Sequence, residues 1–328
     1  MRVDSKFALR LKDRFDFDVS ALPAYTDEQA TEFLTDLIES SNFLSKLQVE
    51  EDVKGSKTIK LLNGDVTLQE VTGCTLTPDG SIVFDGKNLV TKRLGMAIKF
   101  CNEDLNGKFT QMLNVIGSNR QDSEMVLEAV IMAYIAQLVK RKSQRLALLG
   151  DTDSIDPELA ISDGFIKKFD ADGDMEVYYS AETAIDDTNG YTIVKGLIDT
   201  IPAIVFDKAL NMSIIIGRTE ALGVIAQYDT LFPTKNSIVY TDVDGVMSFT
   251  FPNTTVRVET VPELNGLNKA YSVCWDYMFL GTDLESDMDG LSIKYDDYIN
   301  ELKAEGLFRL GVEFVLGQYF TRTHLAIS

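Results

Sequence analysis

The chain has 328 residues, 45% of them hydrophobic, which is enough for a substantial buried core and is a length typical of about two domains. Its 31 basic and 51 acidic residues give a net charge of −20, which opposes nonspecific binding to nucleic acid or to anionic lipid. The three cysteines, Cys74, Cys101 and Cys274, are far apart in the sequence. They indicate neither a disulfide framework nor a CxxC metal site, as is typical of a protein of the reducing cytoplasm.

The N-terminal stretch is basic although the whole chain is acidic. Residues 1–14 contain five basic and two acidic side chains, among them Arg10, Lys12 and Arg14. We expect an arm that either packs across its own domain or reaches a neighbouring subunit or a negatively charged interior. The start of the sequence lacks the apolar stretch and cleavage site of an export signal, so no export is expected. A helix is predicted to begin at Thr26.

Between Lys46 and Phe100 the apolar pattern takes a period of two, which predicts antiparallel strands. The predicted strands are Thr58–Leu62, Val66–Val71, Ser81–Phe84 and Leu89–Phe100, with turns at Asn63-Gly64, Pro78-Asp79-Gly80 and Asp85-Gly86. This β segment has a thin apolar face and basic edges. A long hairpin of this kind usually finds its missing partner elsewhere in the chain or in another subunit. Its basic residues are Lys54, Lys57, Lys60, Lys87, Lys92 and Arg93.

The stretch Asp122–Leu149 predicts one long helix that organises the chain. It contains no Gly or Pro, has acidic residues near its start and basic residues near its end, and is followed by Gly150. Apolar side chains cover more than half of its circumference, which predicts burial on most sides, and its length would be about 40 Å. The apolar part, Met125–Val139, is too short to cross a bilayer, which needs about 20 residues.

Three acidic motifs have the carboxylate spacing of a calcium loop: Asp170-Ala-Asp172-Gly-Asp174, Asp242-Val-Asp244-Gly245 and Asp287-Met-Asp289-Gly290. In the first, Met175 and Ala181 occupy the positions that require Gly and a bidentate acid. We interpret the motifs as exposed acidic turns, and the second as a hairpin turn.

The second half of the chain predicts an α/β lobe. Helices are expected from Thr192 to Pro202, over Thr219–Tyr228 and over Tyr295–Ala304, and a strand buried on both faces over Met212–Gly217. Further strands are predicted at Ser237–Thr241, Val246–Phe251, Thr254–Thr260, Ala270–Gly281 (with Trp275 as a core anchor) and Gly306–Phe320.

The sequence contains no recognisable catalytic or nucleotide-binding motif. The single histidine, His324, is four residues from the end and is expected to be exposed; no phosphate-binding loop, dinucleotide motif or GxSxG occurs. The acidic pairs Asp186-Asp187 and Asp296-Asp297 are interpreted as solvated, because adjacent side chains on a regular element point apart. No catalytic, cofactor-binding or metal-binding residue is predicted.

The order of these parts, together with KRKSQRLALLGD (Lys140–Asp151), DGFIKKF (Asp163–Phe169) and the lobe entered through NGYTIVKGLIDTIPAIVFDKALNMSIIIG, resembles the major capsid proteins of tailed bacteriophages. The resemblance implies an α+β Hong Kong 97-type fold with a long spine helix. The implied parts are an N-terminal arm and helix (1–48), an extended β-hairpin loop (49–95), a peripheral domain with the spine helix (96–191), an α/β axial domain (192–285) and a return to the peripheral domain (286–328).

The same resemblance implies the function: a structural subunit, not an enzyme, of the icosahedral head shell around a double-stranded DNA genome. Implied partners are further copies in hexamers and pentamers, a separate scaffolding protein, a portal and, as an option, decoration proteins; the DNA would be packaged without sequence-specific binding, and no membrane is involved. The implied location is the virion capsid, assembled in the host cytoplasm. The loop begins too soon after Met1 for a cleaved scaffolding domain, and no crosslink is predicted because no partner for the loop lysines is identified.

Two alternatives stay open, an encapsulin-like nanocompartment shell of the same fold and, disfavoured by the absent motifs, a soluble carboxylate or metal enzyme. The candidate subunit-interface residues are Arg10, Lys12, Arg14, Lys54, Lys57, Lys60, Lys87, Lys92 and Arg93.

Overall fold

The computed structural model describes residues 43–66, 80–101, 135, 138–208, 210–243, 245–282, 292–296 and 301–326. It divides into two compact units: unit 1 contains Met1–Ile38, Arg93–Arg141 and Leu284–Phe308, and unit 2 contains Glu39–Lys92, Lys142–Asp283 and Arg309–Ser328. The predicted N-terminal arm, the helix from Thr26, the motif at Asp287 and most of the predicted spine helix lie outside the described residues.

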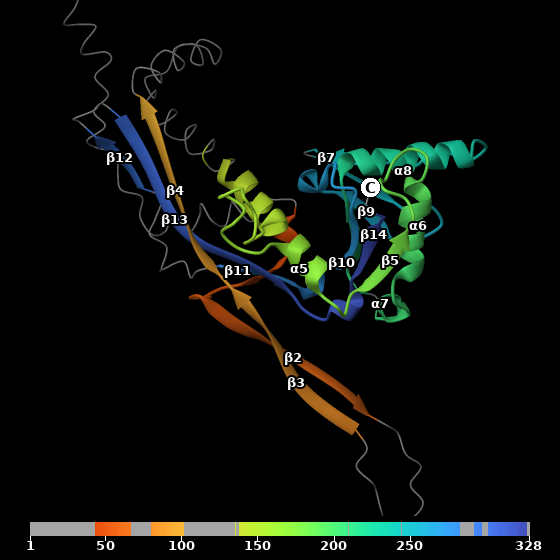
Figure 1. Cartoon of the computed structure of the whole chain (residues 1–328), viewed down its shortest axis with the longest axis horizontal. Helices are drawn as coiled ribbons and strands as arrows, with labels where there is room; N and C mark the ends of the chain where they lie inside the picture. The colour runs from red at the N-terminus through yellow and green to blue at the C-terminus, as the bar shows by residue number, and fades with distance from the viewer. Residues whose placement is uncertain are drawn as a thin grey trace, which may run out of the picture. The chain divides into compact units, whose positions relative to one another are not determined.

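A seven-stranded sheet forms the centre of unit 2 (Figure 1). The central strand β6 (Met212–Ile216) is almost wholly buried, as predicted for an apolar run with a neighbour on either face. It lies antiparallel to β10 and parallel to β9. The strand order is β5 (Glu176–Ser180), β14 (Thr321–Leu325), β10 (Ala270–Cys274), β6, β9 (Arg257–Thr260), β8 (Val246–Thr250) and β7 (Thr241–Val243).

Two helices of unit 2 cross closely because glycines allow it. They are α6 (Gly190–Thr200) and α8 (Arg218–Leu231), both predicted from the sequence. Two shorter helices with defined bounds are α5 (Phe165–Ala171) and α7 (Ala203–Asp207). A Cβ on Gly190 would lie 2.9 Å from the backbone nitrogen of Val224, so a larger side chain would separate the two helices. From α8, the Gln227 side chain accepts the N–H of Thr192 at 3.0 Å and so satisfies a donor in the first turn of α6.

An aromatic cluster joins α5 to the strands at the C-terminal end of the chain. The Phe169 ring lies 4.8–5.7 Å, centroid to centroid, from the rings of Phe165, Phe314, Phe320 and Tyr271, and Phe169 is fully buried. Packing of this density makes α5 part of the core of unit 2.

The predicted strand Ala270–Gly281 is divided between two sheets. After β10 the chain makes a 3₁₀ turn, η4 (Trp275–Tyr277), and continues as β11 (Met278–Gly281). β11 lies parallel to β1 (Gln48–Glu50) and pairs antiparallel with the final residues of β13 (Glu301–Phe314), from Met278↔Phe314 to Gly281↔Gly311. The predicted core anchor at the turn is confirmed: Trp275 is buried, and its Nε1–H donates to Ser213 Oγ at 3.0 Å. Three further 3₁₀ turns are η2 (Leu44–Lys46), η3 (Pro262–Leu264) and η6 (Gly317–Tyr319).

In unit 1 the described strands are β4 (Lys92–Cys101), β12 (Ser292–Asp296) and the beginning of β13. β12 and β13 form an antiparallel pair with Tyr295 opposite Leu302, and β4 pairs with β13. The predicted helix Tyr295–Ala304 is therefore wrong. Apolar and charged residues alternate along both arms of this hairpin, and such a period of two fits a strand.

The part of the predicted spine helix that the structure describes is residue 135 and the helix over 138–149. Its last turn is buried at Leu146, Ala147 and Leu148, whereas Arg141 and Lys142 are exposed. The burial predicted on most sides is therefore confirmed for the last turn, and the part of the predicted helix before residue 135 lies outside the described residues. No helix among the described residues is long and apolar enough to span a bilayer.

Two predictions for residues 237–251 have different outcomes. The hairpin turn after Asp242 is confirmed, since β7 and β8 pair with Val243 opposite Val246 and Gly245 has a φ of +81°. The strand predicted over Ser237–Thr241 is wrong for most of its length, because β7 begins only at Thr241 and residues 237–240 belong to no strand.

Candidate subunit-interface site

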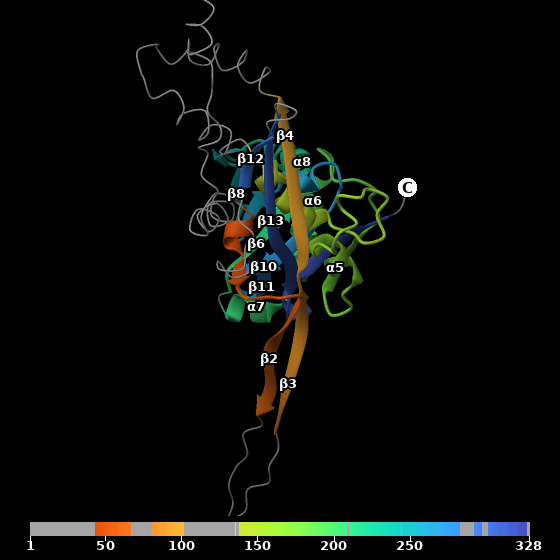
Figure 2. The ribbon, with the colours of Figure 1, turned by 90° about the vertical axis from the view of Figure 1, so that its left-hand side faces the viewer.

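The predicted β hairpin is present as a long two-stranded ribbon. β2 (Ser56–Val66) pairs antiparallel with β3 (Gly80–Val90) without interruption, from Ser56↔Val90 to Val66↔Gly80, and Figures 1 and 2 show the two strands side by side. The turns predicted at Asn63-Gly64 and Asp85-Gly86 are wrong: Gly64 lies opposite Ile82, and Asp85 lies opposite Leu61. Both dipeptides lie inside the paired strands, with paired residues on either side of each. The turn predicted at Pro78 falls on the segment 67–79, outside the described residues.

The two faces of the ribbon near its root differ in burial. Leu89 is fully buried, and Ile59 and Lys87, on the same face, are partly buried. On the opposite face Ser56, Thr58, Lys60, Asn88 and Val90 are all exposed. We call these five residues the free face. The Thr58 hydroxyl donates to Asn88 Oδ1 at 2.7 Å, which is the cross-strand contact that the register requires, and Val90 is 44% exposed despite its apolar side chain.

The root of the ribbon is held by hydrogen bonds centred on Thr91. Its hydroxyl donates to the Val53 carbonyl at 2.6 Å, and its N–H donates to the Gly55 carbonyl at 2.9 Å. The N–H of Val53 in turn donates to the Thr282 carbonyl at 3.1 Å. Gly55 has a φ of +99°, a backbone conformation that side chains other than glycine rarely adopt. Thr91 and Val53 are buried, so this end of the ribbon is part of the core of unit 2.

Two glycines that the sequence analysis did not single out make room for the root. A Cβ on Gly311 would lie 2.1 Å from the Val90 carbonyl oxygen, and a Cβ on Gly281 would lie 2.8 Å from a methyl of Thr91. Both glycines lie within strands, where an isolated glycine often marks the close approach of another backbone. A glycine inside a predicted strand was therefore the sequence feature that could have indicated these two contacts.

A further contact of the root joins the ribbon to the acidic motif after α5. Lys87 Nζ lies 2.7 Å from Asp172 Oδ2 and 4.2 Å from the centroid of the Phe314 ring. The side chain of Asp172 is only 12% exposed, so the interpretation as an exposed acidic turn is wrong for Asp172, although Asp170 and Asp174 are exposed. Asp170 is paired with Lys269 at 2.5 Å. These carboxylates therefore bind cations of the protein itself.

The remaining candidate interface residues fall into three groups. Lys57 binds Glu50 at 2.7 Å within its own subunit. Lys60 and Lys92 are exposed, as are Lys54 and Arg93, which each also have an interaction within the protein. Arg10, Lys12 and Arg14 lie outside the described residues.

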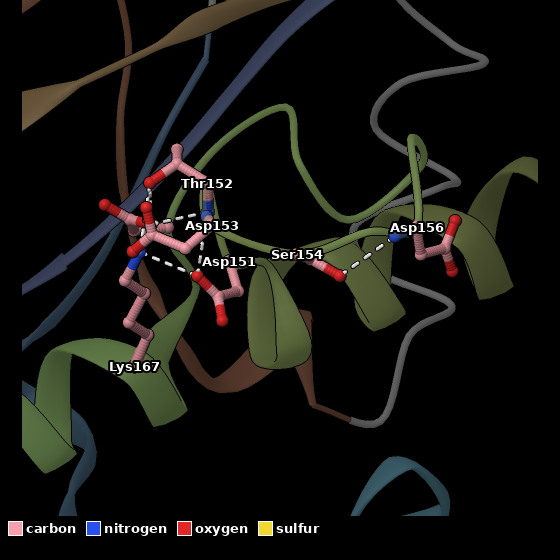
Figure 3. A network of polar contacts seen from close by, with 7 residues as sticks. Asp151, Thr152, Asp153, Ser154, Asp156 and Lys167 are labelled. Atoms are coloured by element: carbon pink, nitrogen blue, oxygen red, sulfur yellow. Dashed lines mark hydrogen bonds and ion pairs between the residues drawn. The ribbon is translucent and has the colours of Figure 1, made fainter.

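A second feature of unit 2 is a tightly held acidic loop directly after the spine helix. We call residues 151–163 the acidic loop. Lys167 of α5 lies 2.7 Å from both Asp151 Oδ1 and Asp153 Oδ2 and 3.0 Å from Asp163 Oδ1 (Figure 3). The three carboxylates raise the pKa of Lys167, the contact with Asp151 being the largest cause. The sequence alone did not indicate that a lysine organises this stretch.

The same network lowers the pKa of two aspartates. The hydrogen bond from Lys167 is the main cause for Asp151. For Asp163 burial acts in the raising direction, but the N–H of Thr152 and the Lys167 ammonium outweigh it, so the pKa is lowered overall. Both carboxylates are therefore ionised at neutral pH and hold the two ends of the loop.

A glycine crossing closes the loop. A Cβ on Gly150 would lie 2.2 Å from the Ser162 carbonyl oxygen, and the Gly164 N–H donates to the Gly150 carbonyl at 2.8 Å. The helix ends directly before Gly150, as predicted. Because Gly150 has no positive φ, a glycine is required here by the close contact with Ser162 and not by a left-handed backbone.

Two side chains that could carry chemistry, the Cys274 thiol and the His324 imidazole, lie among the described residues. Burial raises the pKa of the Cys274 thiol to about 12, and His324 is exposed, as predicted, against the ring of Tyr179 at 5.3 Å. No group of three or more His, Cys, Asp or Glu side chains there is arranged to hold a metal ion. A cavity of about 20 Å³ beside Trp275 has room for roughly one water molecule.

Comparison with known proteins places the fold. No protein-family model matches the chain, and no curated protein matches it. Solved structures do match: the satellite phage P4 procapsid with its size determination protein Sid has a TM-score of 0.58 at 10% identity, covering 90% of this chain and 99% of that chain. Gordonia phage Cozz has a TM-score of 0.55 at 12% identity, covering 88% and 87%, and the capsid of an empty GTA particle has 0.54 at 13% identity, covering 88% and 90%. The predicted α+β fold of the Hong Kong 97-type capsid proteins is confirmed by these likenesses.

Proposed function

We propose that the chain is the major capsid protein of a tailed phage, a structural subunit whose copies assemble into an icosahedral shell around double-stranded DNA. The observation that carries the proposal is the ribbon β2–β3 in the setting of a capsid fold: its root is built into unit 2, but its free face is exposed along the described root. An isolated two-stranded ribbon is at best marginally stable in water, so a neighbouring copy is the natural source of its missing contacts.

In this proposal the ribbon is the extended loop of residues 49–95 and acts between copies. The other parts keep the roles that the resemblance implies: an arm at 1–48, a peripheral domain at 96–191 and 286–328, and an axial domain at 192–285. Copies would close into hexamers and pentamers, since one surface that contacts a different surface of the next copy generates rings. A separate scaffolding protein and a portal would complete assembly in the host cytoplasm.

The charge of the chain supports packaging without sequence-specific recognition. At −20 the subunit repels DNA overall, so contact with the genome would be confined to local basic stretches such as residues 1–14. Shell formation is a matter of geometry and requires no catalytic residue.

Electron microscopy of the purified protein, combined with nuclease treatment, tests the proposal. Recombinant chain expressed with its scaffolding protein is expected to form closed icosahedral particles, and particles from infected cells are expected to contain double-stranded DNA that resists nuclease until the shell is opened. Particles that enclose protein cargo instead of DNA would favour the encapsulin-like alternative. A chain that stays monomeric under all these conditions would refute a shell function altogether.

A further inference from the structure

The acidic loop presents an apolar side chain to solvent. Ile155 is 100% exposed, and Ile161 in the same loop is 39% exposed. Single exposed apolar residues are common on protein surfaces, so exposure alone says little. What distinguishes Ile155 is that the backbone on either side of it is held in place.

Hydrogen bonds fix the backbone around Ile155. The N–H of Ser154 donates to the Asp151 carbonyl at 2.9 Å, and the N–H of Asp156 donates to Ser154 Oγ at 3.2 Å. Arg145 of the spine helix binds Asp156 at 3.1 Å, and Figure 3 shows the Lys167 network on the other side of the same segment. A side chain presented on an ordered backbone loses little conformational entropy when a partner covers it.

The surroundings of Ile155 are negatively charged. Residues 151–163 contain five acidic and no basic residues, against the three cations Lys142, Arg145 and Lys167 that pair with them. The side chain of Asp153 is 85% exposed, and that of Glu158 is 56% exposed. A partner for this surface should combine an apolar spot with positive charge.

The free face of the ribbon has that composition. It carries exposed Val90 and exposed Lys60, and Lys92 follows directly beyond Val90. The strands that carry the free face, residues 54–66 and 80–93, contain six basic and two acidic side chains; two of the basic ones, Lys57 and Lys87, lie on the other face and are paired within their own subunit. Val90 lies opposite Ser56, so Lys60 is about 13 Å further along the same face, within reach of a carboxylate flanking an apolar contact at Val90.

We infer that the acidic loop of one copy is the docking surface for the free face of the ribbon of a second copy, with Ile155 against Val90 and the flanking carboxylates near Lys60 and Lys92. This inference rests on the proposed function, because it names the surface that receives the ribbon in the shell. An aliphatic anchor surrounded by complementary charge is the common arrangement of a small interface centre.

A cross-link between two different chains tests the contact. Chains with Ile155→Cys and chains with Val90→Cys are co-assembled, oxidised mildly and separated on a non-reducing gel. The expected result is a disulfide-linked pair of the two chains in assembled particles and its absence when either variant is mixed with the parent chain. Particles without the mixed pair would overturn Val90 as the partner of Ile155.

Substitutions at Ile155 separate docking from folding. Ile155→Asp should leave the unfolding midpoint of the free subunit unchanged, because the side chain is wholly exposed, yet lower the particle yield at least about ten-fold. Ile155→Leu, the matched control, should keep both. Normal yield from Ile155→Asp would overturn the inference and leave the proposed function standing, whereas a parent chain that forms no particles would overturn the proposed function itself.

Discussion

Shortening the ribbon should leave the subunit folded but unable to form a shell. Replacement of residues 59–87 by Asn-Gly joins Thr58 to Asn88, which already lie opposite each other, through a two-residue turn that suits an antiparallel pair. The buried root residues Val53, Leu89 and Thr91 and their hydrogen bonds are retained.

The loss of stability can be worked from the contacts removed. Lys87 loses its ion pair with Asp172 and its position over the Phe314 ring, together worth about 1–2 kcal/mol for a partly exposed lysine. The partly buried side chain of Ile59 adds about 1 kcal/mol. A loss of about 2–3 kcal/mol leaves a domain of ordinary stability, about 5–15 kcal/mol, folded.

The assay is urea unfolding of the unassembled subunit, followed by circular dichroism, beside electron microscopy of the same preparation. Lys87→Met in the full-length chain is the matched control: it should lose the ion pair and about 1–2 kcal/mol but still assemble, because the ribbon keeps its full length and all of its free face. Global unfolding of the shortened chain would show that the ribbon belongs to the subunit core, and normal shells from it would show that the ribbon does not act between copies.

Three further substitutions test unit 2. Lys167→Met should destabilise the acidic loop at pH 7 but not in acid. Lys167 lowers the pKa of Asp151 and Asp163, so these carboxylates contribute stability above their ordinary pKa of 3.8 and lose it as the pH falls through their lower folded pKa values. The melting curves of parent and variant should therefore converge at that low pH. Gly150→Ala should destabilise the subunit by about 1–3 kcal/mol in urea, because its Cβ would clash with the Ser162 carbonyl; an unchanged midpoint would mean that the crossing is looser than the structure has it. Phe169→Ala should cost about 3–5 kcal/mol at the centre of the aromatic cluster, whereas a loss below 1 kcal/mol would refute its role as a core residue.

Long, strongly patterned elements were predictable because one local signal decides them. The apolar run at β6, the helices α6 and α8, and the hairpin as a whole follow from periodicity and length, and the structure confirms them. The element order was also enough for the fold class, which the comparison with capsid structures confirms. These features depend on the pattern of apolar residues within one segment and not on which distant residues the segment contacts.

Other features depend on partners far away in the sequence, and those predictions were wrong or missing. Asn63-Gly64 reads as a turn in isolation, but it lies within a ladder because Val83 and Ile82 stand opposite. The segment Ala270–Gly281 reads as one strand, but it serves two sheets because η4 turns the chain at Trp275.

The candidate site shows the same limit. Lysines on the ribbon were found by composition alone, but the pairing of Lys87 with Asp172 joins residues 85 positions apart and has no local signal. The organisation of the acidic loop by Lys167 and the exposure of its Ile155 likewise became visible only in the folded chain.

The most direct test of the whole account is a cryo-electron microscopy reconstruction of purified particles at a resolution that traces the chain. The account predicts a closed icosahedral shell in which the ribbon β2–β3 of each copy leaves its own unit 2 at Thr91 and lies across a neighbouring copy. A small open oligomer, or a shell in which each ribbon folds back onto its own subunit, would contradict it.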